Sequence, residues 1–319
     1  MSKIFIKDLK AETKLKSFFG VASKSVRKTK DGKTYLDIDL IDQSGRINAK
    51  MWSNADDYKT KFEEGDSVAV EGTVILFSNK LQIKVFKIRK VTDEDEKYGY
   101  NSRDIIPTTI KNIDTMWEDI HLQIESITNG YLKKVLLNIM AKYEMELKTH
   151  PAAMKLHHAF RGGLLEHTHN MLQLADYVCR VYPEANRDLV VSGVLLHDVG
   201  KLRELEPGVN INYTDIGNFV GHLVIGRDIF LEEVREIPDF PEDIRVKMEH
   251  IILAHQGKLE WASPREPKIL EAMLVYHIDE IDTRVAQYKK AIEDDESEGN
   301  WTDKRNYFSR ILYKGDKQS

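Results

Sequence analysis

The stretch TYLDIDLI at residues 34–41 alternates strictly between apolar and polar side chains. Its apolar side chains fall on one face and its polar side chains on the other, a period of two that is typical of a half-buried β-strand. The apolar face carries Leu36, Ile38 and Leu40. This stretch therefore predicts a strand that packs one face against a hydrophobic core.

Four further strand patterns surround this one, and turn-forming pairs such as Asp31-Gly32 separate them. They cover residues 17–29, 46–52, 67–77 and 81–91. The pattern of 67–77 places Leu76 on the core face, and that of 81–91 changes phase at Phe86, which predicts a bulge. Five short strands in an open sheet would leave unpaired edges. We therefore expect a closed five-stranded barrel of the oligonucleotide/oligosaccharide-binding (OB) type.

From Ile113 onward the apolar residues recur every three or four positions, which predicts helices. Helical patterns continue over 164–178, 187–198, 219–235, 241–255 and 267–282, with no second cluster of strands. The sequence thus predicts a multi-domain α and β chain, an OB-type barrel followed by an all-α helical bundle. The expected boundaries are a barrel at 1–91, a linker at 92–112, connecting helices at 113–149, a helical catalytic domain at 150–290, and an acidic run with a tail at 291–319.

Charge and histidine are distributed unevenly along the 319 residues. Residues 1–90 hold 19 Lys and Arg against 12 Asp and Glu, a net charge of +7, whereas the rest of the chain has a net charge of −12. None of the 11 histidines precedes His121. A basic module suits a polyanion, and a module rich in His and Asp suits a metal.

The composition also predicts where the protein works. Cys179 is the single cysteine, which excludes an internal disulfide and fits a reducing cytoplasm. The sequence has no long apolar run and no apolar leader, so we expect a cytoplasmic protein without a membrane span.

Five short motifs place a histidine or an aspartate directly after apolar residues, as in GGLLEHTHN at 162–170 and VLLHDVGK at 194–201. One such histidine is more often a hydrogen-bonded core residue. Several buried together would be costly unless they share a cation, so their repetition predicts a metal site. The candidate ligands are His167, His197, Asp198, His222, His255 and Asp279.

The order H…HD…D, with Gly-Lys two residues after the HD pair, resembles the HD superfamily of metal-dependent phosphohydrolases. The resemblance implies that His167, His197, Asp198 and Asp279 hold one ion, and that His222 and His255 supply a second. His255 is followed by glutamine, where members with two metals often have a second histidine. The number of bound ions, one or two, therefore stays open. Histidine and carboxylate ligands suit Mn²⁺, Fe, Ni²⁺ or Co²⁺.

The chemistry expected of this site centres on His197, Asp198 and Lys201. A bound divalent ion acidifies water and draws charge from a phosphoryl oxygen. Lys201 would share a helix face with the His-Asp pair and meet the substrate phosphate as a point charge. The alternative for Lys201 is an ordinary lysine at a helix end.

The basic front module has features of a single-strand-binding surface, in which aromatic side chains stack on bases. Tyr35, Trp52 and Phe77 lie on faces opposite the core residues, and Arg46 and Lys50 share the face of Trp52. These five residues are our predicted nucleic-acid contacts. Alternatively, the aromatic residues cover an open end of the barrel or meet the second domain.

Together the two modules resemble the YhaM-type 3′-5′ exoribonucleases, from the strand set through KLHHAFRGGLLEHT to LVYHIDEIDTRV. The resemblance implies hydrolysis of single-stranded RNA from its 3′ end, with single-stranded DNA as a second substrate and Mn²⁺ as the ion. Two alternatives remain. One is an HD nucleotidase or cyclic-nucleotide phosphodiesterase with a regulatory OB domain, and the other is a non-catalytic nucleic-acid-binding protein with a structural metal. The sequence predicts no oligomeric state.

Overall fold

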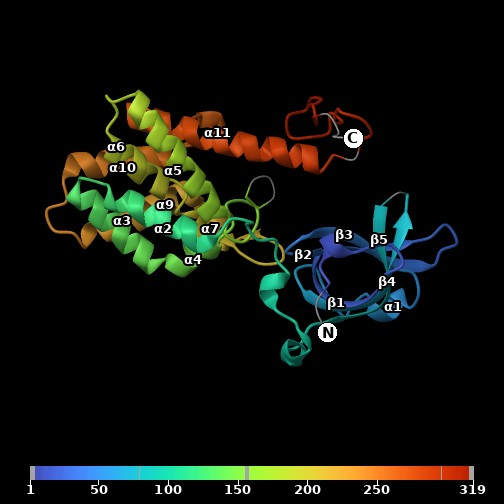
Figure 1. The fold of residues 1–319 in the computed structure, drawn as a ribbon. Helices are drawn as coiled ribbons and strands as arrows, with labels where there is room; N and C mark the ends of the chain where they lie inside the picture. Colours follow the sequence, from blue (N-terminus) through green and yellow to red (C-terminus); the bar gives the residue numbers. More distant parts are fainter. Residues whose placement is uncertain (1–3, 79, 155–157, 296, 316–319) are drawn as a thin grey trace. The chain divides into compact units, whose positions relative to one another are not determined.

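The computed structural model describes residues 4–78, 80–154, 158–295 and 297–315. The chain divides into two compact units, one of residues 1–108 with 207–212 and the other of residues 109–206 with 213–319. The five long strands lie in the first unit and the long helices in the second (Figure 1). Each unit has a hydrophobic core of its own.

The first unit is a closed barrel with the strand order β1-β2-β3-β5-β4 (Figure 1). Neighbouring strands are antiparallel except for β3 and β5, which pair in parallel. A short helix, α1 (Ala55–Tyr58), joins β3 to β4, and a 3₁₀ helix, η1 (Ile6–Asp8), precedes β1. The predicted barrel is therefore confirmed. Its strands are β1 (Lys14–Lys28), β2 (Thr34–Asp42), β3 (Gly45–Met51), β4 (Ser67–Phe77) and β5 (Lys80–Lys90).

The core of the barrel follows the predicted alternation with one exception. Leu36, Ile38 and Leu40 are fully buried, as expected from the period of two. Leu76 is 60% exposed, so its predicted place in the core is wrong. It pairs with Leu81 near the end of the β4–β5 hairpin, one residue before β4 ends.

The predicted bulge lies at Phe86. Glu71 pairs with Lys87 and Gly72 pairs with Val85, so Phe86 is the extra residue on β5. A Cβ atom at Gly72 would lie 2.6 Å from the carbonyl oxygen of Lys84, which explains why the position opposite the bulge is a glycine.

Between the barrel and the bundle the chain forms two 3₁₀ helices, η2 (Asp93–Tyr98) and η3 (Ser102–Asp104). Asp95 is buried and accepts hydrogen bonds from both terminal nitrogens of Arg89, at 2.6 and 2.7 Å. This paired contact anchors η2 to the end of β5.

The second unit is a helical bundle, as predicted. Helix α6 is buried along most of its length and packs against α5, α10 and α11. The bundle also contains a 3₁₀ helix, η4 (Leu259–Trp261). Its helices are α2 (Ile113–Glu125), α3 (Gly130–Lys142), α4 (Glu144–Thr149), α5 (Gly163–Val181), α6 (Arg187–Leu196), α7 (Lys201–Glu204), α8 (Asp215–Val220), α9 (His222–Arg235), α10 (Glu242–Ala254) and α11 (Leu270–Glu293).

Two details of this unit differ from the sequence prediction. The helix expected over 219–235 is interrupted at Gly221, whose φ of 78° suits glycine and not other residues. This break makes His222 the first residue of α9. Two short strands that were not predicted, β6 (Leu205–Glu206) and β7 (Asn212–Tyr213), pair with each other.

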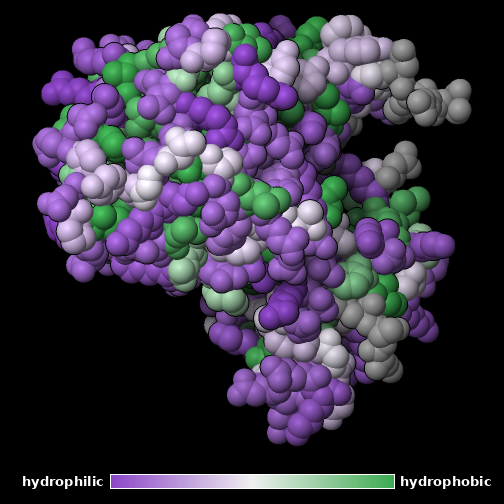
Figure 2. All heavy atoms as spheres, turned by 60° about the vertical axis from the view of Figure 1, so that its left-hand side comes forward, coloured by the Kyte–Doolittle hydropathy of each residue, from purple (hydrophilic) through white to green (hydrophobic). Residues whose placement is uncertain are grey.

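Hydrophilic side chains cover most of the face of the molecule drawn in Figure 2, and hydrophobic residues appear there in small groups. Among the described residues, no helix has the length and apolar character that crossing a membrane requires.

Candidate metal centre

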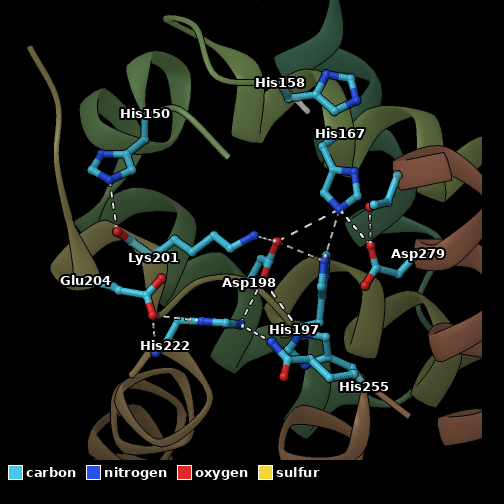
Figure 3. Close-up of polar contacts among 12 residues, drawn as sticks. His150, His158, His167, His197, Asp198, Lys201, Glu204, His222, His255 and Asp279 are labelled. Carbon is cyan, nitrogen blue, oxygen red and sulfur yellow. Dashed lines mark hydrogen bonds and ion pairs between the residues drawn. The ribbon is translucent and has the colours of Figure 1, made fainter. Parts of the chain in front are cut away.

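Five helices and their ends bring all six predicted ligands together. The side chains project toward one another in the interior of the bundle (Figure 3). His167, His197 and His255 are at most 2% exposed, and Asp198 is 4% exposed. Their elements are α5 for His167, the turn after α6 for His197 and Asp198, the start of α9 for His222, the end of α10 for His255, and α11 for Asp279.

The first group of donor atoms surrounds His167. Its Nε2 atom lies 3.2 Å from Nε2 of His197 and 3.3 Å from Oδ1 of Asp279. Oδ2 of Asp198 lies 3.3 Å from His197 Nε2 and 3.9 Å from His167 Nε2. Two histidine nitrogens and two carboxylate oxygens therefore lie close enough together to bind one metal ion.

The second group shares Asp198 with the first. Oδ1 of Asp198 lies 3.6 Å from Nε2 of His222 and 3.6 Å from Nε2 of His255. The donor atoms of these three residues all lie within 4.8 Å of one another. Asp198 thus turns one carboxylate oxygen to each group, which is the geometry of a bridging carboxylate.

The hydrogen bonds of the four imidazoles determine which nitrogen carries the proton. In each ring Nδ1 lies next to an acceptor oxygen and donates its hydrogen there, so in the neutral ring Nε2 keeps its lone pair. Burial also lowers the pKa of His255, which favours its neutral form. The acceptors are Asp282 Oδ2 for His167 at 2.7 Å, the Val194 carbonyl for His197 at 2.8 Å, Glu204 Oε1 for His222 at 2.9 Å, and the Ile252 carbonyl for His255 at 2.8 Å.

This donor set fits a divalent cation. Four imidazole nitrogens and two carboxylates that face one another require positive charge, and Lys201 supplies part of it through its contact with Asp198 Oδ2. Burial opposes a charge on His167, yet its hydrogen bonds to Asp279 and Asp282 raise its pKa to about 9. Burial also opposes the charge of Asp198, but Lys201 and His197 hold its pKa well below the usual range. The centre therefore favours a bound positive charge over neutral side chains.

Two residues that the sequence analysis missed orient the predicted ligands. Asp282 accepts hydrogen bonds from His167 Nδ1 and, at 2.8 Å, from His158 Nε2. Glu204 accepts hydrogen bonds from the backbone and the ring of His222. Carboxylates in this position fix the ring orientation of a histidine ligand. The spacing of Asp282, one helical turn after Asp279, was an available signal, whereas Glu204 is brought to His222 only by the fold.

Lys201 reaches the centre by a route other than the expected one. Helix α6 ends at Leu196 and does not continue to Lys201, which begins α7. Its Nζ atom lies 2.5 Å from Asp198 Oδ2. Burial would lower the pKa of Lys201, but Asp198 raises it above the usual value, so the side chain keeps its charge.

Gln256, the residue after His255, lies beside the second group. Its Nε2 atom is 3.4 Å from Nε2 of His222. Its Oε1 atom is buried and has no hydrogen-bond partner among the residues that the structure describes. Buried acceptors are normally hydrogen-bonded. The Gln256 oxygen is therefore an acceptor at this end of the centre that lacks a donor among the described residues.

The predicted nucleic-acid residues occupy one surface of the barrel. The rings of Tyr35 and Trp52 stack with centroids 4.5 Å apart. Nζ of Lys50 lies 5.6 to 5.9 Å from the ring centroids of Tyr35, Trp52 and Phe77. Trp52 is 42% exposed and Phe77 is 59% exposed. Arg46 is exposed on β3, four residues before Lys50 and therefore on the same face of the strand.

Comparisons with known proteins agree with this architecture. Residues 21–91 match the OB-fold nucleic acid binding domain family, and residues 164–284 match the HD domain family. The 3′-5′ exoribonuclease YhaM of Listeria welshimeri serovar 6b is 34% identical over 266 residues, which are 82% of this chain and 83% of that protein. The chain belongs to the YhaM family. The YhaM of Bacillus subtilis (strain 168) is 33% identical over 263 residues, 82% of each chain.

Among solved structures, the second OB-fold domain of replication protein A from Methanococcus maripaludis matches 29% of this chain and 97% of its own. The identity is 23% and the TM-score is 0.24. Within the YhaM family, the HD domain implies a divalent metal, and the His and Asp groups described above fit that requirement.

Proposed function

We propose that this YhaM-family protein is a metal-dependent 3′-5′ exoribonuclease that degrades single-stranded RNA, and also single-stranded DNA, with Mn²⁺ as its ion. The observation that carries the proposal is Asp198, whose two oxygens face two groups of histidine nitrogens in a chain that also has an OB barrel. Its relatives are named 3′-5′ exoribonucleases, which supports RNA as the substrate and attack from the 3′ end.

The ligand roles follow from the two groups. His167, His197, Asp198 and Asp279 would hold the first ion, and Asp198, His222 and His255 would hold the second. Bound ions supply an acidified water and positive charge at the phosphodiester. The chain itself keeps four imidazoles in one tautomer. It also shields their nitrogens from bulk water, since His167, His197 and His255 are buried and the His222 side chain is 14% exposed.

Lys201 is our candidate for contact with the substrate phosphate. An ammonium group has three donors, and the contact with Asp198 uses one of them. The remaining donors can bond to a phosphoryl oxygen beside the Asp198 carboxylate. Lys201 would thus hold the scissile group in place and offset the negative charge that develops in the reaction.

The barrel would hold the strand. Trp52 already stacks on Tyr35, so a base would stack on an outer face of this pair or on Phe77, while Lys50 and Arg46 meet phosphates. Stacking of this kind tolerates any base, as an enzyme that removes successive nucleotides needs. We keep the predicted division of labour, with strand binding in residues 1–91 and hydrolysis in residues 150–290.

We also place the enzyme in the cytoplasm. Its single cysteine, Cys179, is buried on α5. Burial raises the pKa of the Cys179 thiol, which therefore stays protonated and unreactive. A reducing compartment suits a chain that has no disulfide.

Two observations argue against the alternatives. An exposed aromatic and basic surface on the barrel suits a strand better than a mononucleotide. Structural metal sites are closed and usually rich in cysteine, whereas the donors here are histidines and carboxylates. A hydrolase acting on polynucleotides therefore fits better than a nucleotidase or a non-catalytic binding protein.

The test compares substrates side by side. The full chain is incubated with Mn²⁺ and a 5′-labelled RNA oligomer, a mononucleotide or a cyclic nucleotide. We expect a ladder of products that shorten from the 3′ end of the RNA. EDTA and the Asp198→Ala substitution should each abolish this hydrolysis. Asp243→Ala, which removes an exposed carboxylate of α10, is the matched control. Hydrolysis of mononucleotides or cyclic nucleotides alone would contradict the proposal, as would an inert, metal-loaded protein.

A further inference from the structure

A second set of aromatic and basic side chains lies on the helical unit, outside the metal centre. Trp261 ends the 3₁₀ helix η4, shortly after α10, and the residue is 37% exposed. Nζ of Lys258 lies 4.4 Å from the centroid of this ring, and the guanidinium carbon of Arg284 lies 5.8 Å from it. Trp261 therefore has two cations near its ring, and more than a third of the residue is exposed.

The arrangement extends to the C-terminal segment. The guanidinium carbon of Arg284 is also 5.5 Å from the ring centroid of Tyr307, which is 49% exposed. Tyr307 belongs to residues 300–315, which hold four Lys or Arg residues and one Asp. The order along this surface is thus cation, ring, cation, ring. We call Lys258, Trp261, Arg284 and Tyr307 the α11 cluster.

The α11 cluster is linked along the chain to two elements of the metal centre: Arg284 lies on α11, and Lys258 and Trp261 follow α10. His255 at the end of α10 is followed two residues later by Gly257, where a Cβ atom would lie 2.3 Å from the ring of Tyr276. Tyr276 precedes Asp279 by one helical turn, and its ring centroid is 6.4 Å from that of Trp261. Arg284 is five residues after Asp279, about 7.5 Å along a helix that rises 1.5 Å per residue. Along the chain, the cluster therefore adjoins the segments that carry His255 and Asp279.

We propose that the α11 cluster is a second single-strand-binding surface, which holds the nucleotides next to the scissile phosphodiester. This inference rests on the proposed hydrolysis of RNA. Exposed rings accept bases by stacking, and guanidinium and ammonium groups between them meet phosphates. Arg284 contacts Glu280 at 3.5 Å through one nitrogen, and a guanidinium with five donors can bind a phosphate as well.

The test measures binding of a fluorescein-labelled single-stranded RNA to the full chain by anisotropy, in EDTA so that no hydrolysis occurs. Trp261→Ala should weaken binding about 5- to 150-fold, the range for one stacked base, and Trp261→Phe should weaken it less. Arg284→Gln should lower the slope of log affinity against log salt by about 0.7, the value for one phosphate contact on a single strand. Arg284→Lys should keep the slope, because it keeps the charge.

The control is Tyr177→Ala. Tyr177 is a 63% exposed ring of α5 with the Arg180 guanidinium 5.8 Å from its centroid, so it reproduces a cation–ring pair elsewhere on the unit. We expect its affinity and salt slope to equal those of the wild type. Should Trp261→Ala fail to fold, Trp261→Phe and the two Arg284 variants decide the question.

Three outcomes separate the inference from the proposed function. Suppose that Trp261→Ala and Arg284→Gln leave the RNA affinity and the salt slope unchanged, while the wild type degrades RNA. This result would overturn the α11 cluster as a binding surface and leave the proposed function intact. If light scattering shows that these variants have a different molecular mass from the wild type, while their RNA affinity is unchanged, the surface is a protein–protein contact. This result would also overturn the inference. Weaker binding in both variants would support the cluster even if the wild type failed to degrade RNA.

Discussion

Glu204 Oε1 accepts two hydrogen bonds from His222, one from the backbone nitrogen at 2.8 Å and one from the ring Nδ1 at 2.9 Å. The same oxygen therefore positions the first residue of α9 and the tautomer of its imidazole. Burial opposes the charge of Glu204, but its hydrogen bond to His222 lowers its pKa below the usual value. Glu204 thus remains a carboxylate and aims His222 Nε2 at Asp198.

The first prediction concerns this contact. Glu204→Gln should weaken binding of the second ion about 10- to 100-fold, because an outer carboxylate orients a histidine ligand and raises its basicity. Calorimetric titration with Mn²⁺ measures the effect. Glu233→Gln is the control, since Glu233 is a buried carboxylate of α9 that pairs with Lys142. Equal affinity for the second ion in Glu204→Gln and wild type would contradict this role.

The second prediction concerns the number of ions. His222→Ala or His255→Ala should reduce the bound metal from about two ions per chain to about one. His167→Ala and Asp279→Ala remove donors of the first group and should reduce RNA hydrolysis at least as much. Elemental analysis of the purified variants gives the count. A wild type that binds a single ion, unaffected by loss of His222, would leave only the first group as a metal site.

The third prediction concerns Gly200 in the VLLHDVGK motif. A Cβ atom at this position would lie 2.0 Å from the His222 carbonyl oxygen and 2.6 Å from the Gly226 nitrogen. Gly200→Ala should therefore push α9 away and lower the free energy of unfolding by about 1–3 kcal/mol, with loss of the second ion. Urea unfolding and elemental analysis test both effects. Gly130→Ala, where a Cβ meets nothing within 4 Å, should leave the metal content unchanged.

The fourth prediction concerns Lys201. Lys201→Gln should keep its metal and lower kcat about 10²- to 10³-fold, the usual effect of removing one donor to a developing negative charge. Single-turnover hydrolysis of labelled RNA measures the chemical step. Wild-type rates in this variant would instead identify Lys201 as an ordinary lysine at the start of α7.

The fifth prediction concerns the barrel. Trp52→Ala should weaken binding of single strands by about 1–3 kcal/mol if a base stacks on this ring. Lys50→Gln should make the salt dependence of binding shallower, because fewer counterions are released. Filter binding over a series of salt concentrations tests both variants. Tyr98→Ala, which removes an exposed ring outside the Tyr35–Trp52 pair, is the control and should bind as the wild type does.

Local sequence patterns determined the two kinds of fold and the residues that meet at the centre. The alternation over 34–41 requires only that one face of a strand be buried, so it predicts β2 without knowledge of its neighbours. In the same way, apolar runs that end in His197-Asp198 or His255 mark the inner ends of helices. Because burial of these groups needs compensation, the residue types alone indicated a metal.

Only the tertiary structure decided how these residues are arranged. Asp198 faces two groups because α5, α6, α9, α10 and α11 converge around it, and no local period records such a convergence. The contact of Glu204 with His222 likewise depends on how α7 packs against α9. Leu76 shows the same limit in the barrel, since its alternation is regular but its side chain is exposed near the end of β4. A sequence period reports which face is apolar, whereas burial and coordination require partners that are distant along the chain.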